Sequence, residues 1–203
     1  MGVYNDVILP KLCDLAMRNE RLRPYRERVI GAAEGRVLEI GSGSGLNLPF
    51  YGARVREILA LEPSPNLLAL ARSAPQSAMP VQFIEASAEA IPLDDGSVDT
   101  VVTTWTLCTI PGAAAALSEM RRVLKPGGKL LFVEHGRSPD RGVRWFQDGL
   151  TPVWRRISGG CHLNRPIRSM IEDGGFRIDR VETGYMQGPK PMTFMYEGSA
   201  RPN

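Results

Sequence analysis

Two glutamates and a glycine-rich turn are the residues of this chain whose types and spacing could do chemistry. In the segment VLEIGSGSGLN, residues 37–47, Glu39 is followed by glycines at alternate positions, Gly41, Gly43 and Gly45. Glycines let a turn adopt positive φ and let a ligand approach the main chain closely. Glu62 ends the next apolar run, where a carboxylate can accept hydrogen bonds from both hydroxyls of a ribose. The spacing therefore predicts a site for an adenosine cofactor.

The glycine spacing also distinguishes between two kinds of cofactor. A dinucleotide fingerprint has the pattern GxGxxG, and its third glycine would fall where this chain has Leu46. Glu39 adds a carboxylate that would repel a pyrophosphate and attract an ammonium or sulfonium group. The pattern ExGxGxG therefore favours a cationic adenosine cofactor without phosphates.

Alternating strands and helices are expected to position these residues. Short apolar runs bounded by turn residues predict strands at 36–40, 55–61, 81–85, 98–103 and 129–134. A helix is expected from the N-cap Ser64, with Pro65 at its first position, and another at 112–124. Such alternation predicts a parallel sheet covered on both faces.

The two ends of the chain have different patterns. Residues 5–33 predict two short helices interrupted by Pro10 and Pro24, with Val7, Ile8 and Leu12 among their apolar positions. A short helix limited by Pro49 is expected after the glycine turn. Residues 135–174 have a helical pattern, and the segments GGFRIDRVETGY and PMTFMYEGS predict an antiparallel hairpin of two closing strands.

Composition limits the classes of protein that fit. The chain has 203 residues and a formal net charge of +3, which is too small to indicate nucleic acid on charge alone. Arginines gather at 18–28 and 137–168, either as solvated helix faces or as a rim for an anionic acceptor. Three cysteines without CxxC or CxxH spacing indicate no zinc site. No apolar run has the length of a membrane span, and a cytoplasmic location is expected.

In this context the sequence resembles the class I S-adenosylmethionine-dependent methyltransferases, whose first motif is (D/E)xGxGxG. The segments ASAEAIPLDDGSVDTVV, TWTLCTIPG and SEMRRVLKPGGKLLFVEH follow in the order and spacing of later motifs of the small-molecule branch. The resemblance implies a Rossmann-like, doubly wound, mostly parallel seven-stranded sheet with an antiparallel C-terminal hairpin. It also implies one domain, with N-terminal helices acting as a lid at 1–33, a cofactor core at 34–135 and an acceptor region at 136–203.

The resemblance implies a role for each matching residue. Glu39 would bind the amino group of S-adenosylmethionine, Gly41 and Gly43 would flank its methionine part, and Glu62 would bind the ribose. The adenine edge would meet Ser87, Ala88 and Glu89, although the family usually has an aspartate where this chain has Ser87. The complete predicted set is Glu39, Gly41, Ser42, Gly43, Gly45, Asn47, Glu62, Pro63, Ser87, Ala88, Glu89, Thr104 and Trp105.

A narrower resemblance concerns the methyl acceptor. The segments GLNLPFY, TLC, EHG, FQDGLTPVW and GGCHLNRP are similar to a branch that includes thiol methyltransferases of animal endoplasmic reticulum. Those animal proteins begin with a hydrophobic membrane anchor that is not carried over to this chain. The branch implies a small-molecule substrate, first a thiol or sulfide, with a quinone, phenol or lipid amine as alternatives.

Several side chains are predicted on the acceptor side. Methyl transfer from a sulfonium is an in-line displacement in which the protein mainly aligns the reactants. Trp105 either faces the sulfonium or fills the pocket wall, and His135 is either a general base or a partner of the backbone. The predicted substrate contacts are Trp105, Cys108, Cys161, His162 and Arg165, with packing as the alternative for the cysteines; no metal is predicted.

Two rival functions remain at this point. An RNA or DNA methyltransferase would fit the arginine groups, but the chain has TTWT where base-methylating enzymes carry (D/N)PP(Y/F/W). A cofactor-binding module without catalysis is the other rival, since a fold does not guarantee an activity.

Overall fold

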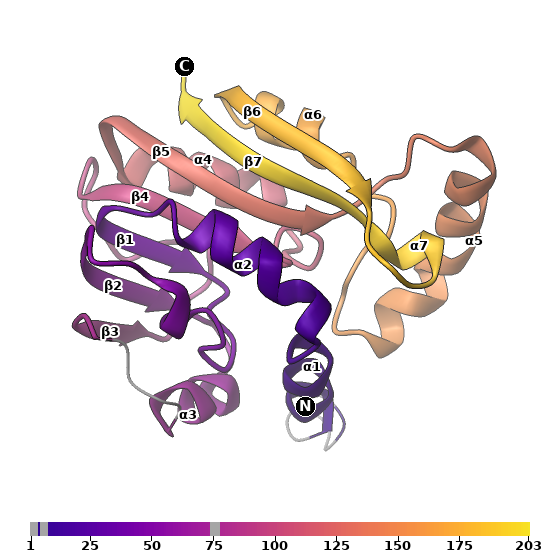
Figure 1. The fold of residues 1–203 in the computed structure, drawn as a ribbon, viewed down its shortest axis with the longest axis horizontal. Coiled ribbons are helices and arrows are strands. Elements are labelled where there is room, and N and C mark those ends of the chain that lie inside the picture. The colour runs from indigo at the N-terminus through magenta and orange to yellow at the C-terminus, as the bar shows by residue number, and fades with distance from the viewer. Residues whose placement is uncertain (1–3, 5–7, 74–77) are drawn as a thin grey trace.

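The structure is a computed structural model that describes residues 4, 8–73 and 78–203 (Figure 1). Residues 5–7 of the predicted N-terminal helices, and residue 74 at the end of the helix predicted from Ser64, lie outside the described residues.

A seven-stranded sheet forms the centre of the molecule, with the strand order β3-β2-β1-β4-β5-β7-β6. Its strands are β1 (Gly35–Ile40), β2 (Val55–Leu61), β3 (Val81–Ile84), β4 (Val98–Thr104), β5 (Leu124–His135), β6 (Phe176–Tyr185) and β7 (Phe194–Pro202). Strands β1 to β5 pair in parallel, whereas β7 runs antiparallel to both β5 and β6. The predicted parallel sheet and its antiparallel C-terminal hairpin are therefore confirmed.

Helices cover both faces of this sheet (Figure 1). They are α1 (Leu9–Met17), α2 (Arg23–Ile30), α3 (Pro65–Ser73), α4 (Ala113–Val123), α5 (Arg141–Ile157), α6 (Ile167–Asp173) and α7 (Lys190–Thr193), with 3-10 turns η2 (Glu20–Leu22) and η3 (Leu48–Phe50). Because side chains alternate across a strand, Leu38 packs with α4 and α6 residues while Val37 packs with α2 residues in a separate cluster. Two apolar cores thus hold the sheet between its helical layers.

The observed boundaries differ from the predicted ones in four places. Pro10 and Pro24 lie in the first turns of α1 and α2, where a missing N–H is tolerated, rather than interrupting the helices. Only the single turn η3 follows the glycine loop. Strand β5 begins at Leu124 rather than at 129, and residues 191–193 of the last predicted strand belong to α7.

Helix α5 is amphipathic, but its polar face packs against the protein and its apolar face is exposed to solvent. It projects beside the C-terminal hairpin (Figure 1), and its buried residues are the polar Gln147 and Thr151. Gln147 accepts a hydrogen bond from Ser138 N at 2.9 Å and donates to the carbonyls of Gly136 and Pro191, both at 3.0 Å. Five large apolar side chains of α5 are exposed, namely Trp145, Phe146, Leu150, Val153 and Ile157, whereas Trp154 is half-buried. Polar contacts therefore attach this helix to the protein.

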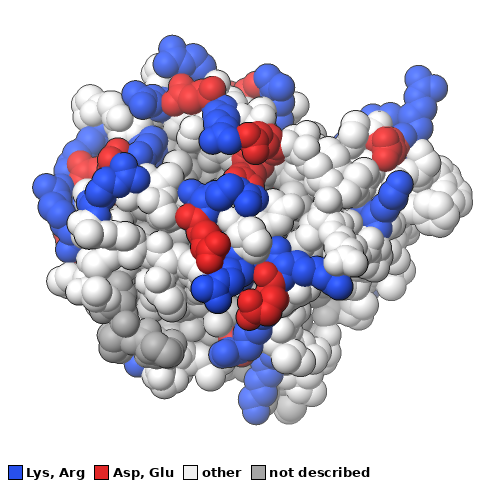
Figure 2. All heavy atoms as spheres, viewed as in Figure 1, with Lys and Arg blue, Asp and Glu red and all other residues white. Residues whose placement is uncertain are grey.

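The first group of arginines largely forms a solvated surface. Basic and acidic side chains are interspersed in Figure 2, and three ion pairs of this kind join Arg18 to Asp14, Arg23 to Glu27 and Arg28 to Glu197. Arg26 is the exception, because its side chain is buried against the glycine loop. Within the described part of the chain, no helix has both the length and the apolar character needed to cross a bilayer.

Candidate active site

The glycine loop lies at the carboxyl end of β1, where the strand order reverses between β1 and β4. Gly41 has φ +65°, and a Cβ there would lie 2.5 Å from the Thr106 side chain. Gly43 has φ +56°, and a Cβ there would meet nothing nearer than 4.0 Å. The first glycine is therefore required by close packing, while the second leaves the backbone open to a ligand.

Glu39 is completely buried at the base of this loop. Its carboxylate accepts hydrogen bonds from Asn47 Nδ2 at 2.7 Å and from the Tyr51 hydroxyl at 2.8 Å. Burial raises the pKa of Glu39 to about 7, against the lowering effect of these donors and of nearby Arg26. The carboxylate is thus held in an environment where a bound cation would favour its ionised form.

Glu62 faces the same loop from the end of β2. Its Oε2 accepts from Gly43 N at 3.1 Å, and its Oε1 accepts from Ser64 N at 3.0 Å. Burial raises its pKa above the ordinary range. Pro63 follows, and the hydroxyl of Ser64 accepts from Leu67 N at 3.4 Å, as expected for the predicted N-cap of α3.

The predicted adenine-contacting residues occupy the loop after β3. Glu89 accepts a hydrogen bond from Gly112 N at the start of α4, and the Ser87 hydroxyl donates to Glu89 at 3.0 Å. Ala88 is buried in the core. The Glu89 carboxylate therefore supports α4, and a contact of this loop with adenine stays a prediction.

Trp105 occupies a strained position at the carboxyl end of β4. Its φ is +51°, and among the described residues no other non-glycine residue has positive φ. Such strain is maintained only where surrounding contacts fix it, and it is frequent at functional sites. Thr104, the residue before it, accepts from Asn47 Nδ2 at 2.9 Å through Oγ1, so the end of β4 is tied to the glycine loop.

Glu134 holds the turn that carries Trp105. This buried carboxylate accepts from the Thr103 hydroxyl at 2.8 Å, from Thr106 N at 3.0 Å and from Leu107 N at 3.1 Å, all through Oε1. Glu134 is not among the site residues predicted from the sequence. The signal was a carboxylate at the end of an otherwise apolar strand, where a buried charge requires partners.

Helices α1 and α2 lie over the glycine loop, at the position predicted for a lid. Asp14 of α1 accepts a hydrogen bond from the Ser44 hydroxyl. Arg26 of α2 donates to Asn47 Oδ1 at 2.9 Å, and its guanidinium carbon lies 5.1 Å from the centre of the Trp105 ring. A buried cation thus already lies over this aromatic face. From the sequence, Arg26 is expected only as part of an arginine-rich surface group, and Asp14 is not among the predicted site residues.

Two orphaned polar atoms test whether the site fits a polar cofactor. Among the described residues, the buried side-chain polar atoms without a hydrogen-bond partner include Ser42 Oγ and Trp105 Nε1, together with one atom each of Arg36, Ser97, Glu134 and Trp154. Buried polar groups are nearly always paired, so an unpaired one calls for a missing partner. Ser42 and Trp105 are both predicted to contact the cofactor, and the open backbone at Gly43 lies in the same loop as Ser42. The residues present therefore fit an adenosine cofactor.

Three segments that are distant in sequence bring the predicted acceptor residues together. Cys161 Sγ lies 3.1 Å from His135 Nε2 and 3.7 Å from Cys108 Sγ. His162 N donates to Cys108 O at 2.9 Å, and the guanidinium of Arg165 donates to Leu107 O. Contact with Cys108 and burial raise the pKa of Cys161, so this group is a thiol near neutral pH.

His135 therefore has a different environment from the one expected of a free base. Its Nε2 faces a cysteine of the protein, whereas the role predicted for it is that of a general base. That role stays a prediction. No metal site is predicted from ligand spacing, yet Cys108, His135 and Cys161 place their ligand atoms within 4.8 Å of one another.

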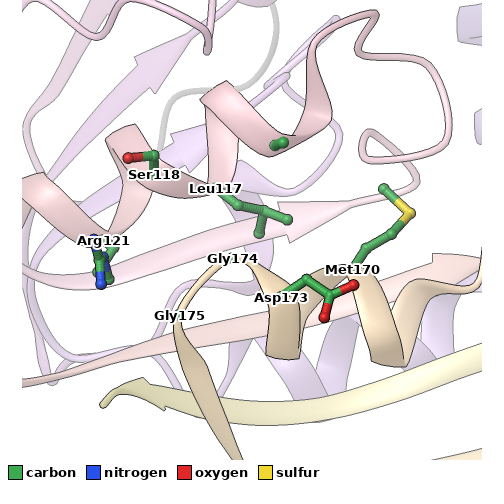
Figure 3. Close-up of a pocket in the computed structure, with 8 residues that line it drawn as sticks. Leu117, Ser118, Arg121, Met170, Asp173, Gly174 and Gly175 are labelled. Carbon is green, nitrogen blue, oxygen red and sulfur yellow. The ribbon is translucent and has the colours of Figure 1, made fainter.

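Two cavities lie elsewhere on the protein. One of about 320 Å³ lies between α4 and α6, lined by Leu117, Arg121, Met170 and their neighbours (Figure 3). The other, of about 570 Å³, lies at the opposite edge of the sheet, among Glu34, Arg54 and Lys125. Neither cavity is lined by a predicted site residue.

The glycine loop, the switch point and the two buried carboxylates define the class: an α/β protein with a nucleoside-cofactor site. Residues 38–132 match the family model described as a methyltransferase domain. The thiol S-methyltransferase TMT1B of Homo sapiens is 33% identical to this chain. The match covers 82% of this chain and 69% of that protein. TMT1B of Rattus norvegicus is 36% identical over 72% of this chain and 62% of that protein. The chain belongs to the class I S-adenosylmethionine-dependent methyltransferases.

Solved structures show the same fold at low sequence identity. An S-adenosylmethionine-dependent methyltransferase of Thermotoga maritima, described as a possible histamine N-methyltransferase, has TM-score 0.66 and 20% identity, covering 100% of both chains. A chain of the Haloferax volcanii complex between the Trm112 methyltransferase activator and a methyltransferase has TM-score 0.75 and 16% identity, covering 100% of this chain and 98% of that one. This chain spans 62% and 69% of the length of the rat and human relatives above.

Proposed function

We propose that this chain transfers the methyl group of S-adenosylmethionine to the sulfur of a small-molecule thiol. The similarity to relatives named thiol S-methyltransferases carries this proposal. The cluster of Cys108, His135 and Cys161 supports it, because it gives the region after β4 and β5 a sulfur-rich, polarisable lining. Residues 34–135 hold the cofactor, residues 136–203 shape the acceptor side, and residues 1–33 cover both.

The cofactor side uses the two carboxylates and the loop between them. Glu39 attracts the amino group, and Glu62 accepts hydrogen bonds from the ribose hydroxyls in place of those from Gly43 and Ser64. Ser42 Oγ and Trp105 Nε1 gain the partners they lack. The Trp105 ring already contacts a cation, the Arg26 guanidinium at 5.1 Å, so a sulfonium that faces the ring would take the place of this contact.

Alignment supplies most of the rate in such a reaction. The acceptor sulfur attacks the methyl carbon in line, and the electron pair of the breaking carbon–sulfur bond returns to the cofactor sulfur. Holding two reactants at attack distance can lower a barrier by about 7–11 kcal/mol. Glu134 contributes by fixing the turn that carries Trp105 and Cys108, since its Oε1 binds two backbone N–H groups there.

Calorimetry tests the cofactor half of the proposal. S-adenosylhomocysteine is expected to bind the wild-type chain with one site, and Glu62→Ala is expected to weaken binding at least 10-fold through loss of a charged hydrogen-bond acceptor. Glu57→Ala is the matched control, because Glu57 lies on the same strand and its carboxylate pairs with Arg36 at the surface. Absence of binding to the wild-type chain would refute the proposal.

The acceptor half is tested by transfer of a labelled methyl group. An alkanethiol, a quinol and an ethanolamine lipid are supplied in parallel with S-adenosylmethionine. Turnover is expected with the thiol alone. Turnover confined to the quinol or the lipid would keep the methyltransferase activity and reject the thiol as its acceptor.

A further inference from the structure

The cluster of Cys108, His135 and Cys161 is built from three separate parts of the fold. Cys108 lies in the turn after β4, His135 ends β5, and Cys161 follows α5. Within the described residues, these are the three His, Cys, Asp or Glu side chains whose ligand atoms gather within 4.8 Å. Cys108 is buried, whereas Cys161 and His135 are half-buried.

The backbone fixes the two cysteines relative to each other. His162 N donates to Cys108 O at 2.9 Å, and Arg137 N donates to Arg165 O at 2.8 Å. These bonds join the segment after α5 to the ends of β4 and β5. The arrangement therefore does not depend on the thiols themselves, which is what preorganised ligands require.

The distances agree with a tetrahedral zinc ion. Zinc binds thiolate sulfur at about 2.3 Å and imidazole nitrogen at about 2.0–2.1 Å, which places two sulfurs of a tetrahedron about 3.8 Å apart. Cys108 Sγ and Cys161 Sγ lie 3.7 Å apart. The same geometry places sulfur and nitrogen about 3.6 Å apart, so the His135 to Cys161 distance of 3.1 Å lengthens modestly when the ion enters.

We propose that Cys108, His135 and Cys161 bind a zinc ion whose fourth coordination position is open to the acceptor sulfur. Thiolate and imidazole ligands select zinc over the hard cations. Two thiolates and a neutral imidazole balance the charge of Zn²⁺, so the filled site is neutral where it is buried. Binding releases the two thiol protons to solvent. As a ligand, His135 holds the metal and is not the general base.

The proposed ion would lie beside the turn that carries Trp105, a residue predicted to contact the cofactor. Cys108 Sγ lies 3.5 Å from the carbonyl oxygen of Trp105, in the same turn. Three protein ligands with one free position are typical of catalytic zinc. An acceptor thiol that binds there loses its proton to solvent and presents a thiolate. After its sulfur has formed the bond to the methyl carbon, the neutral thioether is a weaker ligand and leaves. This step rests on the proposed function, whereas the zinc site does not.

Cobalt is a spectroscopic probe for the metal site. Reduced, full-length protein titrated with Co²⁺ is expected to bind one equivalent, with the strong visible bands of tetrahedral cobalt and a near-ultraviolet thiolate charge-transfer band, and Zn²⁺ is expected to bleach both. Cys108→Ser, His135→Gln and Cys161→Ser are each expected to weaken Co²⁺ binding about 100-fold or more. His162→Gln is the matched control, since it removes the neighbouring histidine and is expected to keep the bands. Circular dichroism of each metal-free variant checks that it folds.

The zinc site and its open acceptor position are tested by separate results. Absence of the bands in the wild-type protein, or their persistence in Cys161→Ser, would overturn the zinc site. A small alkanethiol added to the cobalt protein without cofactor is expected to strengthen the charge-transfer band, while the matching alcohol is not. An unchanged band would overturn the open acceptor position. Neither result depends on methyl transfer, so failure of the proposed function is recognised separately.

Discussion

The buried carboxylate of Glu39 makes the stability of this protein depend on pH in the opposite sense to an ordinary surface glutamate. Its pKa is raised from 4.5 to about 7 in the folded state, mainly by burial. The unfolded chain therefore ionises Glu39 at lower pH than the folded protein does. As the pH rises from 4.5 to 7, the folded state loses stability relative to the unfolded state, and above 7 the full penalty applies.

The magnitude follows from the two pKa values. At about 1.4 kcal/mol per tenfold change in acidity, a rise from 4.5 to about 7 corresponds to about 3 kcal/mol. Glu39→Gln removes this penalty, because the amide is neutral at every pH and its oxygen can still accept from Asn47. The free energy of unfolding of Glu39→Gln minus that of the wild type is thus expected to increase by about 3 kcal/mol between pH 4.5 and 8.

Urea unfolding at a series of pH values measures this difference. Other groups that titrate in this range affect both proteins alike, so the difference isolates Glu39 and the charges that face it, those of Arg26 and Glu62. Glu57→Gln serves as control and is expected to follow the wild type in parallel. Parallel curves for Glu39→Gln and wild type from pH 4.5 to 8 would show that the carboxylate is not held in the environment described.

Three further substitutions test other contacts. Gly41→Ala is expected to lower stability by about 2 kcal/mol or more, because its φ is positive and the new Cβ meets Thr106; an unchanged melting temperature would contradict this. Gln147→Leu leaves three backbone groups next to α5 without their hydrogen-bond partner. The free energy of unfolding in urea is expected to fall by about 3 kcal/mol or more, and an unchanged value would contradict this. Asp14→Ala breaks the contact with Ser44 and is expected to speed amide exchange in α1 about 10-fold while leaving β1 protected; equal protection of α1 in both proteins would rule out this contact as its anchor.

The sheet could be predicted from the sequence because its signals are local. A parallel strand buried on both faces is a continuous apolar run, and the range 55–61 coincides with β2. The glycine spacing and the carboxylates at strand ends located the loop and Glu62 for the same reason. Their neighbours in sequence are also their neighbours in space.

The remaining features depend on contacts between distant parts of the chain. Arg26 belongs to an arginine-rich segment, and nothing in its local pattern separates it from solvated neighbours such as Arg23. Cys108, His135 and Cys161 are 26 or 27 residues apart in sequence, so their meeting depends on β4, β5 and the end of α5 converging. Pairwise spacing rules for metal ligands do not detect such a site.

Because the apolar face of α5 is exposed to solvent, the identity of its outer residues has little effect on the free energy of folding. Water already surrounds Trp145, which is 71% exposed, and Phe146, which is 59% exposed. Exchanging exposed side chains of this kind normally changes stability by no more than about 0.5 kcal/mol. This helix therefore offers positions where solubility can be improved, or a fluorophore attached, without disturbing the architecture that holds the cofactor loop.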